Sequence, residues 1–255
     1  AACSQEDVIV ADKGAAIGFD TFVENSTRVA QSTDPSLTVD AMKQGEGFGV
    51  YGFVTNVIDE TNNTTATAPL FTDKQVKWTN GVWKYEGTQY WIDGATYDFA
   101  AIAPYNSYKV TEAATTGVTL DFTNNGETDL LYAQNNAVAG SAHSKVGFTF
   151  KHLLAKAKVS VKETAKIENG GYYVVTGVHL KNTHKTATYT IGTGWADWAE
   201  AYDLQFGNIV AVNEENPDNT AALQLPLGTG AKGASHYERL IIPQNNCELT
   251  IVVDY

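Results

Sequence analysis

Apolar and polar residues alternate with a period of two along much of the chain. Val146, Phe148 and Phe150 alternate with Gly147 and Thr149, which predicts a strand with one buried face. The same signal, or a short apolar run between turn residues, predicts further strands at Ile17–Val23, Phe48–Thr55, Gln75–Trp78, Val82–Tyr85, Tyr97–Ala103, Val118–Phe122, Ala157–Val161, Tyr172–Leu180, Ala187–Ile191, Ala221–Leu225, Arg239–Ile242 and Leu249–Val253. Many short strands separated by turn-rich segments favour an all-β sandwich architecture.

Helical periodicity is scarce. We expect one short helix at Ser36–Lys43, capped by Asp34 or Ser36, and possible helix at Trp195–Tyr202, where two Trp residues lie three positions apart. Three polar, turn-forming segments are expected to be surface loops with little order of their own: Asp59–Ala68, Thr123–Glu127 and Asn213–Asn219.

The chain has 255 residues, which suits two domains or one large β domain. Small and polar residues at Ala139–Lys145 separate two β-rich halves. We therefore expect a boundary there, with an N-terminal β-sandwich over residues 1–144 and a C-terminal β-sandwich over residues 145–255.

Composition excludes some classes of partner. The net charge is −12, with 17 Lys and Arg against 29 Asp and Glu, which argues against nucleic acid and against attraction to an anionic bilayer surface. No apolar stretch is long enough to span a membrane. A chain rich in Thr, Asn and Tyr, with Arg only at Arg28 and Arg239, suits an extracytoplasmic β protein.

Signals for catalysis or metal binding are weak. None of the five His residues falls in a ligand motif, and no GxSxG nucleophile motif occurs, so we expect no metal, no cofactor and no enzyme activity. Cys247 begins an apolar strand and is interpreted as a small buried hydrophobe rather than a reactive thiol. Gly228–Gly233 lacks the GK[ST] ending of a phosphate loop and is interpreted as a turn.

A group of aromatic residues has two interpretations. Trp78, Trp83 and Trp91, with Tyr85 and Tyr90 nearby, could stack on sugar rings. The same residue types are common in sandwich cores and cross-strand pairs, and that interpretation is the stronger one. The alternative function is therefore a surface lipoprotein that binds glycans through exposed aromatic residues.

The opening Ala1-Ala2-Cys3-Ser4 resembles the end of a bacterial lipobox, in which small residues precede an acylated Cys. The resemblance implies lipidation at Cys3 after export, with the polar residues that follow acting as a tether. The membrane would then be reached through this N-terminal anchor alone.

Several segments, in order, resemble the fimbrillin-like proteins of Bacteroidales, the subunits of type V pili. The segments are Gly18–Val29, Val76–Trp91, Tyr97–Pro104, Asp129–Ala133, Val146–Lys158 and Ile241–Gln244. The resemblance implies two tandem transthyretin-like β-sandwiches and a structural, adhesive role in a surface fimbria at the outer membrane. Its partners would be other fimbrial subunits, joined head to tail, and surface receptors.

In that family a protease cuts after an Arg in the loop that follows the first strand, and the strand leaves with its lipid. The resemblance places the scissile bond between Arg28 and Val29. The residues agree, because Arg28 lies in a polar connection after the strand predicted at Ile17–Val23, where cleavage is generally tolerated.

Loss of that strand would expose a row of unpaired backbone groups beside an apolar groove, which is a template for a strand from another chain. We expect Ile17, Phe19, Phe22 and Val23 to be the side chains that fill the groove. The sequence ends at Tyr255 directly after a strand-like run, whereas stalk subunits of the family carry a C-terminal donor strand. Whether the subunit belongs to the stalk, the tip or the anchor therefore stays open.

Overall fold

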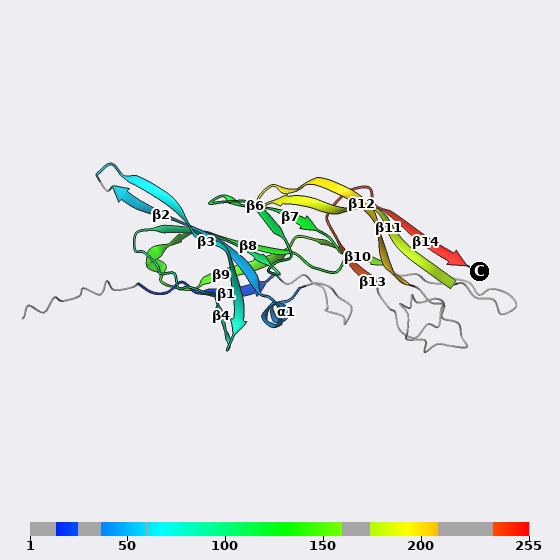
Figure 1. The fold of residues 1–255 in the computed structure, drawn as a ribbon, viewed down its shortest axis with the longest axis horizontal. Helices are drawn as coiled ribbons and strands as arrows, with labels where there is room; N and C mark the ends of the chain where they lie inside the picture. The colour runs from blue at the N-terminus through cyan, green and yellow to red at the C-terminus, as the bar shows by residue number, and fades with distance from the viewer. Residues whose placement is uncertain (1–13, 25–36, 60, 160–173, 209–236, 255) are drawn as a thin grey trace, which may run out of the picture.

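The computed structural model describes residues 14–24, 37–59, 61–159, 174–208 and 237–254. These residues are almost entirely β structure (Figure 1), so the all-β prediction is confirmed. The strands are β1 (Phe19–Val23), β2 (Phe48–Asp59), β3 (Thr64–Thr79), β4 (Val82–Lys84), β5 (Thr96–Ala103), β6 (Lys109–Ala114), β7 (Gly117–Thr123), β8 (Leu131–Ala139), β9 (Val146–His152), β10 (Ala155–Val159), β11 (Val174–Thr190), β12 (Gly194–Asn208), β13 (Tyr237–Ile241) and β14 (Glu248–Asp254). Helix α1 (Val39–Gln44) and the 3-10 turn η1 (Gly140–Ala142) complete the elements.

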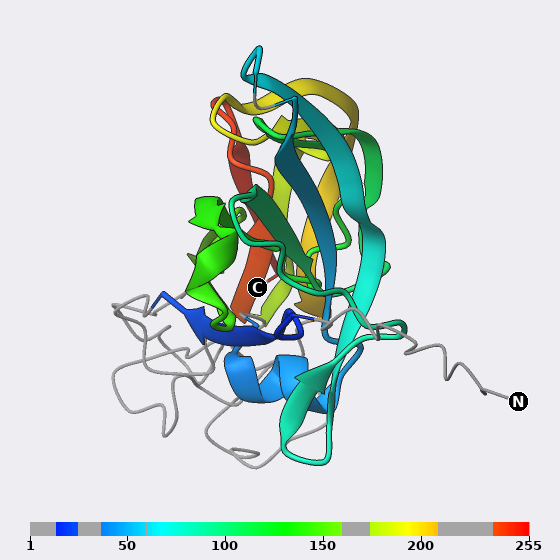
Figure 2. The ribbon, with the colours of Figure 1, turned by 90° about the vertical axis from the view of Figure 1, so that its left-hand side faces the viewer.

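The larger sheet has seven strands in the order β1-β9-β8-β5-β2-β3-β4. All of its pairings are antiparallel except the one between β1 and β9, which run parallel. The sheet curls so that its two ends meet. The Trp83 indole on β4 donates a hydrogen bond to the Thr21 hydroxyl on β1. Figure 2 shows β1 in blue, lying next to helix α1.

The second sheet joins β6 and β7 to the strands that follow residue 174. Its order is β12-β11-β7-β6, and β14 pairs with the first half of β11. Strands β10 and β13 form a separate two-stranded sheet. In Figure 1, β14 lies at one end of the molecule and the β2–β3 hairpin projects at the other.

Two apolar cores result, and β5 contributes to both. Tyr97, Phe99 and Ala101 lie in the first core, inside the curled sheet, whereas Ala100 and Ile102 lie in the second, between the two sheets. Because both faces of β5 are covered, its sequence is a nearly continuous apolar run rather than an alternating one.

Helix α1 confirms the predicted short helix, although its N-cap is Thr38, whose hydroxyl accepts a hydrogen bond from the Ala41 backbone N–H. The helix predicted at Trp195–Tyr202 is wrong, because this segment belongs to strand β12. Asp197 and Glu200 have positive φ angles of 52° and 51°, and the register shifts near Asp197. Such bulges interrupt the period of two and leave a three-residue spacing that imitates a helix.

The predicted loop at Asp59–Ala68 is largely wrong, since β3 begins at Thr64. Residues 61–69 are exposed, as expected of a loop, but Thr favours extended structure and the Thr55 and Thr67 hydroxyls bond across the hairpin at 2.8 Å. The predicted strand at Ala221–Leu225 and the predicted loop at Asn213–Asn219 lie outside the described residues.

The division into sandwiches over residues 1–144 and 145–255 stays a prediction. Strand β9 begins at Val146 yet pairs with β8 and β1 in the larger sheet. Strand β7, from the N-terminal half, pairs with β11 from the C-terminal half. The sheets therefore continue across the position where the sequence predicts a boundary.

Candidate functional site: the slot of strand β1

Strand β1 is an edge strand of the larger sheet, and together with the residues that precede it lies in a slot between β9 and the chain after β4. On one side it pairs in parallel with β9, where the Glu24 N–H donates to the Phe150 carbonyl at 2.8 Å. On the other side the segment after β4 closes the slot, with the Ile17 N–H donating to the Gln89 carbonyl at 2.9 Å. Strand β1 therefore satisfies backbone groups of β9, and the residue Ile17 before it satisfies a backbone group of the chain after β4.

The inward side chains of this segment fill the first core. Ile17 and Phe19 are each 2% exposed, and Val23 packs partly buried against the same core. Five aromatic rings surround the Phe19 ring, with centroids 5.6–6.4 Å away: Phe48, Phe71, Tyr85, Phe99 and Phe148. Removal of β1 would therefore expose rings from β2, β3, β5 and β9 together.

The expectation for Phe22 is wrong, because its side chain is 62% exposed. In a strand successive side chains point to opposite faces. Ile17, Phe19 and Val23 share one face, and Phe22 lies on the other with Asp20. Three side chains, rather than the predicted four, fill the groove.

Two side-chain hydrogen bonds hold the strand from the β4 side. The Trp83 Nε1 donates to the Thr21 hydroxyl at 3.0 Å, and the Tyr85 hydroxyl donates to the Ile17 carbonyl at 2.8 Å. Burial raises the pKa of the Tyr85 hydroxyl above its usual value, so this group, protonated at neutral pH, remains a donor under more alkaline conditions as well.

The outer face of the slot carries ion pairs. Lys145 Nζ lies 3.1 Å from Asp20 Oδ1, and Lys151 Nζ lies 3.9 Å from Glu24 Oε2. Lys145 packs closely over Gly18, where a Cβ would lie 3.3 Å from Lys145 Cγ. All four charged groups are substantially exposed, so each pair contributes little stability.

A buried carboxylate anchors the chain where it enters helix α1. Asp129 is 3% exposed, and its Oδ2 accepts hydrogen bonds from the Leu37 N–H at 2.8 Å and from His152 Nδ1 at 2.6 Å. His152 is the last residue of β9, the partner of β1. The segment that follows the predicted cleavage position is thus bonded to the body of the molecule independently of β1.

The residues predicted for lipidation and cleavage, Cys3, Arg28 and Val29, lie outside the described residues. The described chain stops at Glu24, immediately after β1, and resumes at Leu37. Cys247 is partly buried and burial raises its pKa, which suits the structural interpretation of that residue.

The proposed sugar-stacking surface is wrong for two of its three residues. Trp83 and Trp91 are 8% and 3% exposed and belong to the first core. Trp78 is half-buried, packs edge-on against Trp83, and carries Lys43 Nζ 4.7 Å from its ring centroid. Stacking on a sugar requires an open ring face, which neither buried Trp offers.

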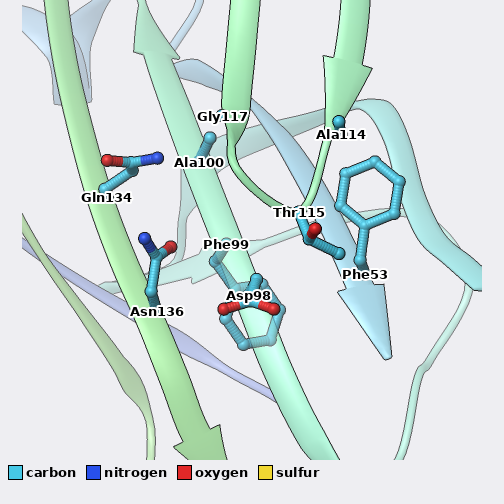
Figure 3. A pocket seen from close by; sticks show the side chains of 9 residues that line it. All are labelled: Phe53, Asp98, Phe99, Ala100, Ala114, Thr115, Gly117, Gln134 and Asn136. Atoms are coloured by element: carbon cyan, nitrogen blue, oxygen red, sulfur yellow. The ribbon is translucent and has the colours of Figure 1, made fainter. Parts of the chain in front are cut away.

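A shallow hollow lies between β5, β8 and the β6–β7 turn (Figure 3). It is lined by Phe53, Asp98, Phe99, Ala100, Ala114, Thr115, Gly117, Gln134 and Asn136. Asp98 Oδ1 already accepts a hydrogen bond from the Ala137 N–H. Small-molecule sites usually measure about 300–1,000 Å³, whereas this hollow has essentially no interior volume, so it does not enclose a ligand.

Across the described ranges, no three His, Cys, Asp or Glu residues are grouped so as to hold a metal ion. Nor does any described helix have the length and apolar character needed to cross a membrane.

Comparison with known proteins identifies the family of the chain. A family model described as fimbrillin-like matches residues 27–255. The chain belongs to the fimbrillin-like family. This membership supports a structural, fimbrial role at the cell surface rather than catalysis. The match begins at residue 27, so β1 lies outside it.

Solved structures share the fold. A fimbrial protein from Bacteroides vulgatus superposes with a TM-score of 0.62 at 19% identity, over 94% of this chain and 83% of that one. A protein described as a cell adhesion protein from Bacteroides uniformis gives 0.52 at 16% identity, over 93% and 80%. A search of curated proteins finds no match.

Proposed function

We propose that this fimbrillin-like chain is a structural and adhesive subunit that assembles by strand exchange in the β1 slot. It is exported as a lipoprotein anchored at Cys3 to the outer membrane. Cleavage between Arg28 and Val29 then frees β1, and a strand of a neighbouring subunit takes its place. The observation that carries the proposal is the burial of Phe19 among five aromatic rings. Removal of β1 would leave these rings exposed and open to a replacement strand.

The energetics require both side chains and backbone. Burial of the three inward apolar side chains contributes about 1.5–3 kcal/mol each, or about 4.5–9 kcal/mol together. Association costs about 4–15 kcal/mol, so side-chain burial alone exceeds the cost only at the lower end of that range. An incoming strand must therefore also restore the hydrogen bonds to β9 and to the segment around Gln89.

Strand exchange of this kind predicts a filament. The donor strand and the acceptor slot are different surfaces, so the contact is head-to-tail, and such contacts grow open polymers unless the rotation closes a ring. The Asp129 contact to the Leu37 N–H supports the scheme, because it secures the chain beyond the cleavage position after β1 has gone.

An arginine-specific protease tests the proposal, because the chain has Arg only at positions 28 and 239. Arg239 lies in β13, paired with Ala157 of β10, which protects its backbone from cleavage. We expect one cut, a new N-terminus at Val29 and concentration-dependent filaments. The matched control Arg28→Lys keeps the charge but resists the protease and should stay unassembled. Filaments from uncut Arg28→Lys, or complete cleavage without any assembly, would contradict the proposal.

A further inference from the structure

We propose that the β1 slot selects its strand by side-chain chemistry: a hydroxyl opposite Trp83 and acidic groups opposite Lys145 and Lys151. This inference rests on the proposed function, since it describes the neighbouring subunit's strand that would replace β1. The pattern, read along residues 17–24, is apolar, small, aromatic, acidic, hydroxyl, any residue, apolar, acidic. The strand runs parallel to β9.

The hydroxyl requirement follows from the surroundings of Trp83. This Trp is 8% exposed, and its ring packs edge-on against Phe48 at 5.0 Å and Trp78 at 5.2 Å. These contacts hold the indole N–H toward β1, where Thr21 Oγ1 accepts it at 3.0 Å. A strand without an acceptor at this position would leave a buried donor unsatisfied, which is costly.

The preferences for an aromatic residue at position 19 and a small residue at position 18 follow from packing. The space beneath β1 at Phe19 is walled by five rings, so a smaller side chain would leave a void among them. At Gly18 the aliphatic part of Lys145 passes over the backbone to reach Asp20. A Cβ at that position would lie 3.3 Å from Lys145 Cγ, so the lysine would have to shift slightly, which favours a small residue there. Phe22 points to solvent, so its position carries no requirement.

The acidic requirement follows from the outer face of β9. Lys145 and Lys151 flank Gly147 and Thr149, both exposed, and each lysine pairs with one carboxylate of the β1 segment. Exposed ion pairs add little affinity, but like charges placed opposite each other repel. The two lysines therefore disfavour a strand that carries basic groups at these two positions.

Competition for the slot tests the proposal directly. The chain is cut at Arg28 and equilibrated with a fluorescent peptide of residues 14–24, which unlabelled peptides then displace. A Thr21→Val peptide keeps the shape of Thr but lacks the hydroxyl, so we expect it to compete about ten-fold more weakly. Thr21→Ser should restore competition, and Phe22→Ala, the matched control, should compete like the native peptide within about two-fold.

Charge is tested in the same assay. A peptide with Asp20→Lys and Glu24→Lys should compete several-fold more weakly at low ionic strength, and the difference should vanish in 1 M salt, where the screening length is about 3 Å. In protein carrying Trp83→Phe, which lacks the donor, the Thr21→Val penalty should disappear. Equal competition by native and Thr21→Val peptides on the native protein would overturn the proposal.

A second measurement keeps the inference separate from the proposed function. In the intact chain, Thr21→Val and Trp83→Phe should be coupled in the unfolding equilibrium. The double variant should raise the equilibrium constant for unfolding about five- to ten-fold less than the product of the two single-variant increases. Additive effects would overturn the slot preference even if Arg28 is cut. Failure of the protease to cut at Arg28 would overturn the proposed processing and leave the coupling result unchanged.

Discussion

At the scale of single residues, the direction of a side chain on β1 decides its role. Phe19 and Phe22 lie in the same strand, three residues apart, yet one is 2% exposed and the other 62%. The sequence alone marks both as aromatic residues of one strand. The period of two distinguishes Phe19 from Phe22 once Ile17 is known to point inward, because residues 19 and 23 lie on the same face as Ile17 and residue 22 does not.

This contrast gives a matched pair of substitutions. Phe19→Ala should lower the free energy of unfolding by about 3–5 kcal/mol, since it leaves a cavity among five rings. Phe22→Ala should change it by no more than about 0.5 kcal/mol. Denaturant titration followed by Trp fluorescence measures both, and similar losses from the two variants would show that β1 is not packed as described.

Two His–Asp pairs differ in burial, so replacement of the Asp should lower stability by different amounts. Asp129, 3% exposed, accepts hydrogen bonds from two backbone N–H groups and from His152. Asp129→Ala should therefore cost at least about 1.5–3 kcal/mol of unfolding free energy. Asp93 is exposed and pairs with His143 at 2.7 Å, so Asp93→Ala should cost about 0–1 kcal/mol. Chemical denaturation compares them, and equal costs would contradict the assigned roles.

At the scale of elements, the sequence predicts strands both where apolar and polar residues alternate and where a short run is continuously apolar. The predicted bounds lie within two residues of the observed ones for β1, β4, β5, β7, β9, β10, β13 and β14. Strands β6 and β8 were missed, because Lys109–Ala114 and Leu131–Ala139 mix small and polar residues without clear alternation. The curl that brings β4 against β1 depends on contacts between residues more than 60 positions apart, which no local pattern contains.

Covered and half-covered strands should respond differently to an introduced charge. On β5 both Ala100 and Ala101 are buried, so a change to Asp at either position should prevent stable folding by burying an unpaired charge. On β9, Phe148→Asp should do the same, whereas Thr149→Asp, on the exposed face, should change stability by less than about 0.5 kcal/mol. Soluble yield and thermal unfolding report the result, and tolerance of Ala100→Asp would contradict the two-sided burial of β5.

At the scale of the whole molecule, the two cores share strands rather than meeting at a linker. Strand β5 contributes to both, and β7 pairs with β11 across the predicted domain boundary. The sequence pattern does not reveal this arrangement, because small, polar segments such as Ala139–Lys145 are typical of linkers as well as of turns within a sheet. The all-β class and a first strand with a buried face were predictable; the sharing of strands was not.

Shared strands predict coupled unfolding. Phe148→Ala in the first core and Phe122→Ala in the second should each lower the midpoint of one common transition, because loss of either core unpacks β5. Calorimetry, with Trp fluorescence as a second probe, checks this. Two separate transitions, each shifted by only one of the variants, would instead support independent domains.

The most direct test of replaceable β1 is the composition of the assembled polymer. Filaments formed after arginine-specific cleavage are collected, dissolved in denaturant and weighed by mass spectrometry. The account predicts subunits that begin at Val29, with residues 1–28 absent from the filament and recovered in solution. Filaments that retain residues 1–28 in equal amounts with the subunit would show that β1 stays in its slot, and would contradict assembly by strand exchange.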